Sequence, residues 1–364
     1  MKLAYKHLFY LFIGCSVFCC ITDTIENPDN TEEALYFPPI NSNDWETVSV
    51  ESLNWNTTAE QDLYDFLNTK HSKAFIILKN GKIAMEWYGN GFDANMNHTW
   101  NSAAKTLSAF TIGIAQQESL LDINSSSQDY LDANWSSMTD IQEENVTVKN
   151  HITMTSGLDY DVPNADCTDP EDLVYKQDPS TFWYYHNAPY TLTHSIVEGA
   201  TNQTFNSYFN SKIRDKIGMQ GVWVPFGCYK LYLSNARSMA RFGLLNLNKG
   251  TWNEEAILSD TNYFNEMTNT SQNLNKAYGY LWWLNGKSSY RLPGSEVEYQ
   301  GTLIPNAPND LIAGLGKNDQ KMYIVPSKKL VVIRMGDVAN PNNPTFGPSG
   351  FDNQLWEKIN ALIN

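Results

Sequence analysis

The sequence is poor in positive charge and lacks several motifs that identify common enzyme classes. Its 25 Lys and Arg residues are outnumbered by 40 Asp and Glu residues, so the 364-residue chain has a formal net charge of −15. We do not expect such an acidic chain to bind nucleic acid, whose phosphates attract basic surfaces. No P-loop or complete Gly-x-Gly-x-x-Gly occurs, so nucleotide binding has no support. The six histidines form no His-x-x-x-His or His-Glu-x-x-His pair, and we expect neither a zinc site nor a cofactor.

Three further absences narrow the choice of architecture and mechanism. Gly-x-Ser-x-Gly, the nucleophile elbow of many Ser-His-Asp hydrolases, does not occur. No fixed-period repeat indicates a solenoid or propeller. Beyond the N-terminal leader, no apolar run is long enough to cross a bilayer. The chain is nevertheless 42% hydrophobic and 13% aromatic, which is enough for a large buried core, and we expect a globular, bilobal protein.

Residues 1–21 resemble an export leader. A basic start is followed by an apolar run from Leu8 to Gly14 and by a second apolar stretch through Ile21. About 14 apolar residues are fewer than the roughly 20 that a spanning helix needs, which favours a secretory signal over a membrane anchor. Gly14-Cys15 also resembles a bacterial lipobox, so lipid attachment at Cys15 stays open as the one route to a membrane. We expect an exported protein that is periplasmic, secreted or lipid-anchored to the cell envelope.

The leader holds three of the five cysteines, which leaves Cys167 and Cys228 in the exported part. An even number of cysteines in an oxidising compartment is consistent with one disulfide, and two free thiols are the alternative. Cys167 lies near the segment before residue 185 and Cys228 near the turn before Ser234, so a bridge between them would brace the rim of a pocket there.

The rest of the chain predicts an α+β fold. Residues 22–45 are acidic and rich in Asn and Pro, which is typical of a tether, and the folded body is expected from residue 46. Two β-rich runs flank Asn80-Gly81 and predict a hairpin. Further strands are expected over residues 278–283, 321–325 and 330–334, helices over 192–200, 205–217 and 236–247, and a closing helix over 353–363.

Strands on both sides of a helical insert indicate one antiparallel sheet that is built from both chain ends and flanked by helices. We expect an α/β lobe over about residues 46–120 and 275–364 and an all-helical lobe over about residues 121–274. The cleft between two such lobes is a natural place for a binding site.

Ser102-Ala-Ala-Lys105 is the only Ser-x-x-Lys in the chain, and it begins a predicted amphipathic helix over residues 102–118. At this spacing the two side chains share one helix face, so the amine can reach the hydroxyl. In a dry site the pKa of the lysine falls, and its neutral amine can take the Ser102 proton. The motif alone is equally compatible with an ordinary surface helix.

Its surroundings resemble the serine β-lactamase and penicillin-binding-protein superfamily. Residues 100–123 are similar to the nucleophile helix of that superfamily, and the segment that ends in Thr155-Ser-Gly-Leu158 is similar to another of its motifs. Pro179-Ser-Thr-Phe-Trp-Tyr-Tyr-His-Asn187 resembles the Pro-Gly-Thr-x-x-x-Tyr-x-Asn box. The resemblance covers about residues 70–340 and implies a β-lactamase/DD-peptidase-like fold.

The resemblance also implies roles for individual residues. Ser102 would attack an ester or amide carbonyl, while Lys105 and Tyr185 would transfer protons as general base and acid. Asn187 would orient the lysine and the substrate.

The third motif departs from the family pattern. Lys-Thr-Gly, which grips a substrate carboxylate, is replaced by Ala313-Gly-Leu-Gly-Lys317. Gly-x-Gly here resembles the class C-like esterase and 6-aminohexanoate-dimer-hydrolase branch. By that resemblance Gly314, Leu315 and Gly316 would line the site, with the N–H groups of Leu315 and Ser102 forming an oxyanion hole.

Two more residues, Tyr160 and Asp161, are expected to contact substrate, whereas Trp282 and Trp283 are expected mainly in the core. The resulting hypothesis is an exported serine hydrolase, an esterase or amidase that acts on small molecules through an acyl-enzyme. A D-Ala-D-Ala carboxypeptidase or a β-lactamase is the alternative within enzymes. A non-catalytic ligand-binding member of the family is the alternative outside them.

Overall fold

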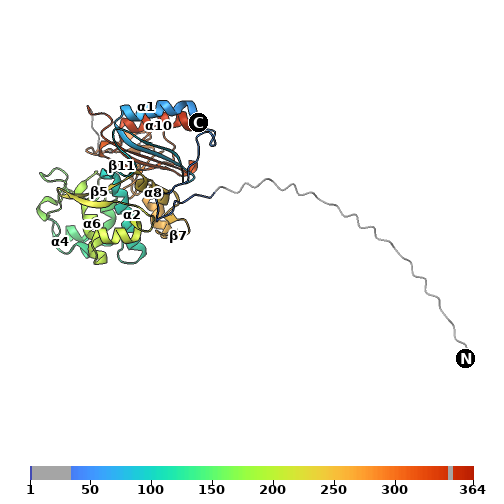
Figure 1. The fold of residues 1–364 in the computed structure, drawn as a ribbon. Helices are drawn as coiled ribbons and strands as arrows, with labels where there is room; N and C mark the ends of the chain where they lie inside the picture. Colours follow the sequence, from blue (N-terminus) through green and yellow to red (C-terminus); the bar gives the residue numbers. More distant parts are fainter. Residues whose placement is uncertain (2–33, 343–346) are drawn as a thin grey trace. The chain divides into compact units, whose positions relative to one another are not determined.

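The computed structural model describes Met1, residues 34–342 and residues 347–364. One compact unit extends from Leu35 to Asn364 (Figure 1). Cys15 and the remainder of the predicted leader after Met1 lie outside the described residues. Within the described part of the chain, no helix has the length and apolar character to cross a membrane.

The packed part of the chain begins at Leu35, before the predicted start at residue 46. The main-chain N–H of Tyr36 donates to the Asn80 carbonyl at 3.0 Å. The ring of Phe37 packs edge-on against Trp252, with 5.1 Å between centroids. The guanidinium of Arg241 donates to the carbonyl of Pro39 at 2.8 Å. Part of the predicted tether is therefore joined to the folded body by main-chain hydrogen bonds and an aromatic ring.

A six-stranded sheet forms the centre of this unit, in the order β2-β1-β13-β12-β11-β8, and every neighbouring pair is antiparallel. The predicted sheet from both chain ends is confirmed, as are the hairpin around Asn80-Gly81 and the paired strands over residues 321–325 and 330–334. The strands are β1 (Ser72–Lys79), β2 (Lys82–Tyr88), β8 (Trp283–Leu284), β11 (Ile312–Gly316), β12 (Gln320–Val325) and β13 (Leu330–Gly336).

The strand predicted over residues 278–283 is wrong except at its end, because only Trp283 and Leu284 join the sheet as β8. The backbone before them bonds elsewhere: Tyr280 N–H donates to the Met267 carbonyl and Leu281 N–H to the Ile152 carbonyl. Leu281 also has a φ of +59°, which is incompatible with a regular strand. The apolar run reflects complete burial and not strand pairing.

Helices cover both faces of the sheet (Figure 1). On one face α1 (Glu60–Thr69) packs against α10 (Gly350–Ile363). On the other face α8 (Ala236–Leu247) packs against β1, β12 and β13. A Cβ on Gly243 would lie 2.5 Å from a methyl carbon of Val331, so glycine allows α8 to approach the sheet closely. The α8 segment was assigned by sequence to the helical lobe, whereas the structure places it on the sheet.

The remaining elements belong mostly to the middle of the chain. Helix α6 packs against α2, α3 and α5, and β3, β5 and β4 form a small sheet that the sequence analysis missed. The helix expected over residues 205–217 is α7 followed by a π-helical turn, Asn210–Arg214. The helices are α2 (Lys105–Gln117), α3 (Gln128–Leu131), α4 (Asp140–Glu144), α5 (Val148–Ile152), α6 (Asn187–Thr201), α7 (Phe205–Phe209) and α9 (Thr261–Met267), with 3₁₀ turns η1 (Thr57–Ala59), η2 (Asn101–Ala104), η3 (Pro170–Asp172), η5 (Lys317–Asp319) and η6 (Pro326–Lys328). The short strands are β3 (His98–Thr99), β4 (Val222–Phe226), β5 (Tyr229–Ser234), β6 (Thr251–Trp252), β7 (Glu255–Ala256), β9 (Ser289–Tyr290) and β10 (Tyr299–Gln300).

A fully buried ion pair joins the sheet to α10. Lys321 Nζ lies 2.9 Å from an Asp352 carboxylate oxygen and 3.3 Å from Asp319. The Tyr323 hydroxyl also donates to Asp352, whose carboxylate accepts the Ser349 N–H at the start of α10. The buried Lys321 ammonium is therefore paired with two carboxylates in the interior, where an unpaired charge would be costly.

We predict that Asp352→Ala lowers the free energy of unfolding by about 3–5 kcal/mol, because it removes a carboxylate partner of the buried Lys321. Asp62→Ala is the matched control, since it breaks the exposed Lys358–Asp62 pair between α10 and α1. That control should lose less than about 1 kcal/mol. Urea unfolding of the three proteins measures both values, and equal losses would contradict the assignment of the buried pair.

Candidate active site

Ser102 sits in η2, immediately before α2, and the residue that anchors it is Trp100. The Trp100 ring is fully buried, and its Nε1 donates to Ser234 Oγ at 2.7 Å. The main-chain N–H of Trp100 donates to the Tyr232 carbonyl on β5, and the two rings meet edge-to-face at 5.2 Å. A large side chain locked in the core two residues before Ser102 fixes where the hydroxyl emerges.

Asn101, the residue before Ser102, adopts a left-handed conformation with a φ of +48°. Asn tolerates this region better than most residues. Its side-chain Nδ2 donates to the Lys317 carbonyl at 2.7 Å, and its main-chain N–H donates to Thr99 Oγ1 at 3.1 Å. The unusual turn before the hydroxyl is thus tied to the end of β11, and a conformation of this kind is common at functional sites.

Lys105 lies on the same helix face as Ser102, as the spacing predicts. Its Nζ is 3.2 Å from Ser102 Oγ and 2.8 Å from Asn187 Oδ1. The Nζ also lies 4.0 Å from the centre of the Tyr190 ring and 5.1 Å from that of Tyr185. Only 3% of the residue is exposed.

This burial changes the acid–base character of Lys105. Desolvation disfavours the charged ammonium and lowers the pKa of Lys105 to about 7, while the charge of Asp166 opposes the fall. A substantial fraction of the amine is then neutral near pH 7 and able to accept a proton from the hydroxyl it contacts.

Tyr185 is buried against a cluster of aromatic rings. Its ring stacks on Trp283 with 5.7 Å between centroids and an angle of 22°, and meets Tyr278 edge-on at 6.2 Å. Burial raises the pKa of Tyr185 above its usual value, although a hydrogen bond with Ser102 opposes the rise. The phenol therefore stays protonated at neutral pH and is suited to donate or relay a proton. Trp283 acts as the wall that orients this ring.

Asn187 connects Lys105 to a residue that the sequence analysis did not select. While its Oδ1 accepts from Lys105, its Nδ2 donates to Asp166 Oδ1 at 2.8 Å. Asn187 is the first residue of α6, so the Asp166 carboxylate lies beside a helix N-terminus, where negative charge is favoured.

The end of β11 passes close to the turn that carries Ser102. A Cβ on Gly316 would lie 3.1 Å from Ser102 N and 2.4 Å from the Trp100 carbonyl oxygen, and one on Gly314 would lie 3.3 Å from the Ala103 carbonyl. Both glycines therefore face η2 and leave no room for a side chain. Leu315 is opposite Lys321 in the sheet and points to the other face, where it is 1% exposed.

A small cavity lies over Ser102, with a volume of about 150 Å³. It opens between the start of α6, the tip of β5 and the end of β11, and charged and hydroxyl groups make up most of its wall. The lining residues are Asn101, Ser102, Lys105, Asp166, Asn187, Tyr190, Tyr229, Lys230, Leu231 and Lys317. Among the predicted site residues, Ser102, Lys105 and Asn187 line it directly. The residues of the predicted set from the other two motifs that do not line it are Tyr185, Gly314, Leu315 and Gly316.

Tyr160 and Asp161 do not line this cavity. The Tyr160 ring stacks on Tyr184 at 3.5 Å, and its hydroxyl donates to Glu296. Asp161 is exposed, and its main-chain N–H donates to the side chain of Asp159. Tyr160 therefore contacts Tyr184, the residue before Tyr185, and does not reach the cavity itself.

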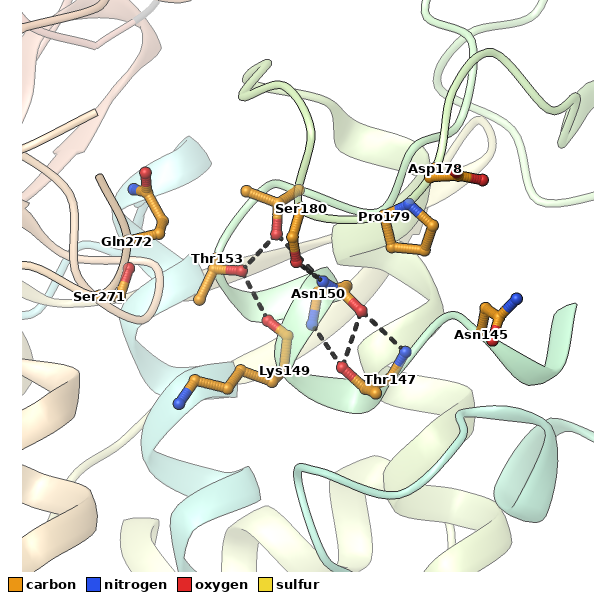
Figure 2. Close-up of a pocket in the computed structure, with 11 residues that line it drawn as sticks. Asn145, Thr147, Lys149, Asn150, Thr153, Asp178, Pro179, Ser180, Ser271 and Gln272 are labelled. Carbon is orange, nitrogen blue, oxygen red and sulfur yellow. Dashed lines mark hydrogen bonds between the residues drawn. The ribbon is translucent and has the colours of Figure 1, made fainter. Parts of the chain in front are cut away.

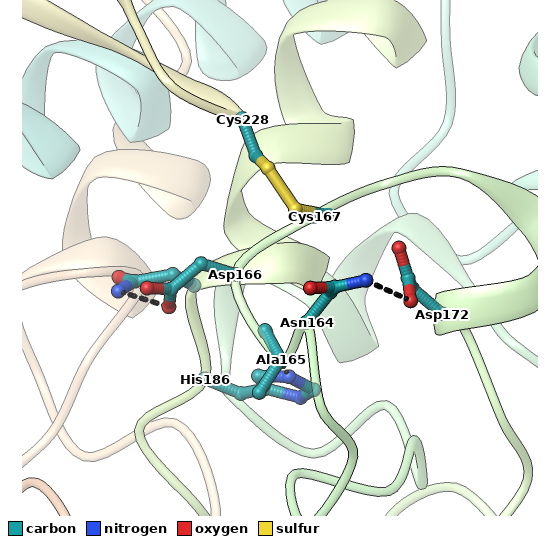
Figure 3. Close-up of a disulfide and its surroundings, with 8 residues drawn as sticks. Asn164, Ala165, Asp166, Cys167, Asp172, His186 and Cys228 are labelled. Atoms are coloured by element: carbon teal, nitrogen blue, oxygen red, sulfur yellow. Dashed lines mark hydrogen bonds between the residues drawn. A yellow bond between two sulfur atoms is a disulfide. The ribbon is translucent and has the colours of Figure 1, made fainter.

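Cys167 and Cys228 form a disulfide, with 4.8 Å between their Cα atoms (Figure 3). Cys167 follows Asp166, and Cys228 lies at the turn between β4 and β5, immediately before Tyr229. Asp166 and Tyr229 both line the cavity. The bridge thus joins two of its walls, which is the location that the sequence analysis expected for it.

A larger hollow of about 510 Å³ lies behind the loop that carries Pro179 and Ser180 (Figure 2). At its centre, Asn150 Nδ2 donates to Ser180 Oγ at 2.8 Å and to Thr155 Oγ1 at 3.2 Å. The side-chain oxygen of Asn150, Oδ1, accepts from the main-chain N–H and the hydroxyl of Thr147. These groups bond to one another, so this hollow supports the loop leading to Tyr185 and contains no candidate nucleophile with a base.

In the part of the chain that the structure describes, no group of three or more His, Cys, Asp or Glu side chains is arranged to hold a metal ion. The residues that sequence reasoning missed are Asp166, Tyr190 and Lys230. None of them belongs to a recognisable motif, because long-range folding alone brings them to Ser102. Near Asp166, the one local feature of the sequence that drew attention was the adjacent Cys167.

A family model described as Beta-lactamase matches residues 69–344. The structure of a candidate 6-aminohexanoate-dimer hydrolase from Bacillus anthracis is similar with a TM-score of 0.64 at 18% identity, covering 90% of this chain and 89% of that one. A family VIII carboxylesterase gives a TM-score of 0.62 at 14% identity, covering 84% of this chain and 97% of the other. A D-stereospecific amidohydrolase from Streptomyces sp. gives 0.56 at 13% identity, covering 81% and 96%.

No curated protein matches the sequence. The structural likenesses, all below 25% identity, show a shared fold. The family match includes the segments that contain Ser102, Tyr185 and the end of β11. The chain belongs to the beta-lactamase family, within the serine β-lactamase and penicillin-binding-protein superfamily.

Proposed function

We propose that the protein is a serine hydrolase that cleaves ester or amide bonds of small substrates through an acyl-enzyme on Ser102. The observation that carries this proposal is the contact between Ser102 Oγ and the buried Lys105 amine at 3.2 Å, together with a Lys105 pKa lowered to about 7. A buried lysine at this distance from an accessible hydroxyl is an activated nucleophile pair.

In the acylation step, neutral Lys105 takes the proton of Ser102 while Ser102 Oγ bonds to the carbonyl carbon. The C–O or C–N bond to the leaving group then breaks, and Lys105 returns the proton through the Tyr185 hydroxyl to that group. Because the pKa of Tyr185 is raised, Tyr185 acts as the protonated relay and Lys105 as the base.

In the deacylation step, the neutral Lys105 amine takes a proton from water, whose oxygen attacks the acyl carbon. The bond to Ser102 Oγ breaks, and the serine oxygen recovers the proton from Lys105. Asn187 keeps the amine in line with Ser102 during both steps, because its Oδ1 holds Nζ at 2.8 Å.

The oxyanion that forms in both steps needs two donors beside Ser102. One is the N–H of Ser102. We assign the second to the main chain at Gly316–Lys317, because this end of β11 approaches Ser102 N and reaches the cavity. The Leu315 N–H, which the sequence analysis expected in this role, is the alternative donor on the same strand.

The cavity favours a small acyl group, since about 150 Å³ accommodates only a few non-hydrogen atoms. In a β-lactamase or D-Ala-D-Ala carboxypeptidase, Lys-Thr-Gly grips the substrate carboxylate, and this chain lacks that motif. Two similar structures are described as a carboxylesterase and an amidohydrolase, which supports esters or amides as substrates. The disulfide supports export, because such bonds persist in oxidising compartments.

We predict that Ser102→Ala lowers kcat/KM for p-nitrophenyl acetate and butyrate by at least about 10³-fold, because it removes the nucleophile. Spectrophotometric initial rates measure this, with a chromogenic cephalosporin as the second substrate. Ser52→Ala is the control, because the exposed Ser52 hydroxyl donates to the Ser49 carbonyl and does not line the cavity. Cephalosporin turnover above ester turnover would favour the β-lactamase alternative, and no Ser102-dependent turnover of either substrate would favour a ligand-binding role.

We predict that kcat/KM of the wild-type protein rises with pH through an apparent pKa of about 7. The base must be neutral, and the lowered pKa of Lys105 means that it loses its proton across this range. Lys105→Met should lose about 10²- to 10⁴-fold in kcat/KM and lose this dependence. A wild-type profile that is flat between about pH 6 and 8 would contradict the assignment of Lys105 as the base.

A further inference from the structure

The loop that contains Asp166 is attached to its surroundings at three consecutive residues (Figure 3). The carbonyl of Ala165 accepts from His186 Nε2 at 2.7 Å, Asp166 accepts from Asn187, and Cys167 is bonded to Cys228. Burial lowers the pKa of His186 to about 4, so the ring is neutral at pH 7 and donates from Nε2. Two of the three attachments lead to the residues that directly follow Tyr185.

Asp166 determines which way the Asn187 amide points. An asparagine amide can present either its oxygen or its nitrogen to a neighbour. A carboxylate only accepts hydrogen bonds when ionised, so the Asn187 NH₂ group must face Asp166 and its oxygen must face Lys105. The reverse orientation would place two donors against each other at Lys105 and two acceptors at Asp166.

The disulfide determines where Asp166 stays. Asp166 is exposed, so packing does not hold it in place. The adjacent Cys167 is joined to the β4–β5 turn, and the sequence continues from Cys228 directly into the cavity wall at Tyr229 and Lys230. The disulfide thus links the β4–β5 hairpin to the Asp166 loop, and hydrogen bonds continue from Asp166 to Asn187 and from Asn187 to Lys105.

We propose that Asp166 is a positioning residue for Lys105, acting through Asn187, and that the Cys167–Cys228 disulfide holds it there. The inference rests on the proposed function only where it treats Lys105 as the base. Charge adds a second effect, because the negative carboxylate favours the ammonium form and partly offsets the desolvation that lowers the Lys105 pKa.

Other titratable or charged groups also lie near Lys105. None of them is changed in the Asp166, Asp172 and cysteine variants described below, so they do not account for a difference between those variants. Helix α6 contributes Tyr190 and the buried His194, whose pKa lies well below its usual value, so that it is neutral. The preceding loop contributes Tyr185, which stays protonated. Lys230 on β5 and Lys317 after β11 line the same cavity and are the other cations there. Asp166 is the only carboxylate that lines the cavity among the described residues.

Two substitutions separate the two effects of Asp166. Asp166→Asn removes the charge but keeps an oxygen that can accept from Asn187, whereas Asp166→Ala removes both. We expect Asp166→Asn to shift the acid limb of the kcat/KM profile to lower pH. We expect Asp166→Ala to show the same shift and, in addition, to lower kcat by up to about 100-fold with a smaller effect on KM, because Asn187 is free to turn.

Asp172→Asn is the matched control. Asp172 lies in the same loop region and accepts from Asn164 Nδ2 at 3.0 Å, but it does not line the cavity. The substitution makes the same change in charge and should leave the pH profile and kcat as in wild type. A shift of the same size in Asp172→Asn would overturn the proposal, because it would assign the effect to overall charge.

The double variant Cys167→Ser/Cys228→Ser tests the role of the bridge. We expect it to reproduce the direction of the Asp166→Ala changes, and we expect Asp166→Ala to cause no further loss of kcat in this background. A bridge that serves stability alone would lower Tm and leave the acid limb at its wild-type pH. That result would overturn the part of the proposal that concerns the disulfide.

The titration of Lys105 itself gives a readout that does not need turnover. The ¹³Cε signal of Lys105, assigned by its loss in Lys105→Met, is followed against pH in wild type and Asp166→Asn. A lower midpoint in Asp166→Asn supports the proposal even if no ester is cleaved, in which case only the proposed function fails. Identical midpoints overturn the part of the proposal that concerns the charge of Asp166, whatever the activity.

Discussion

The burial of the Lys105 amine between two tyrosine rings is the constraint that the arrangement of the site depends on. A charged ammonium is costly at such a position, and the structure offers it one amide oxygen, one hydroxyl and two ring faces. The result is an amine that is neutral for part of the time at physiological pH. A surface lysine at the same spacing from Ser102 would be fully protonated and chemically inactive as a base.

Three separate parts of the chain are needed to build this environment. Trp100 fixes the turn that carries Ser102 from the core, and α6 supplies Tyr190 and Asn187 from the opposite side. The end of β11 approaches the turn through Gly316, while Lys321 and Asp352 hold the same sheet region to α10. The site therefore lies where the central sheet meets the helices of the middle segment, and its precision comes from elements that are far apart in sequence.

Local sequence patterns predicted the parts of the fold and site that local chemistry determines. Asn80-Gly81 encodes its hairpin by turn geometry, and the spacing of Ser102 and Lys105 encodes a shared helix face. The strand predicted over residues 278–283 failed because complete burial removes the alternation that distinguishes a strand from a packed irregular segment. Asp166 and Tyr190 could not be predicted, since only the tertiary fold brings them to Lys105. The approach of Gly314 and Gly316 to the turn at Ser102 could not be predicted either, because the sequence does not reveal which face of β11 meets η2.

The central claim is that the buried amine activates Ser102 for covalent catalysis. The most direct measurement is the intact mass of the protein after brief reaction with p-nitrophenyl butyrate and acid quenching, followed by peptide mapping. The account predicts one butyryl group per chain on the peptide that contains Ser102, and no such group in Lys105→Met under the same conditions. An unmodified protein, or a butyryl group on another residue with Ser102 unmodified, would contradict it.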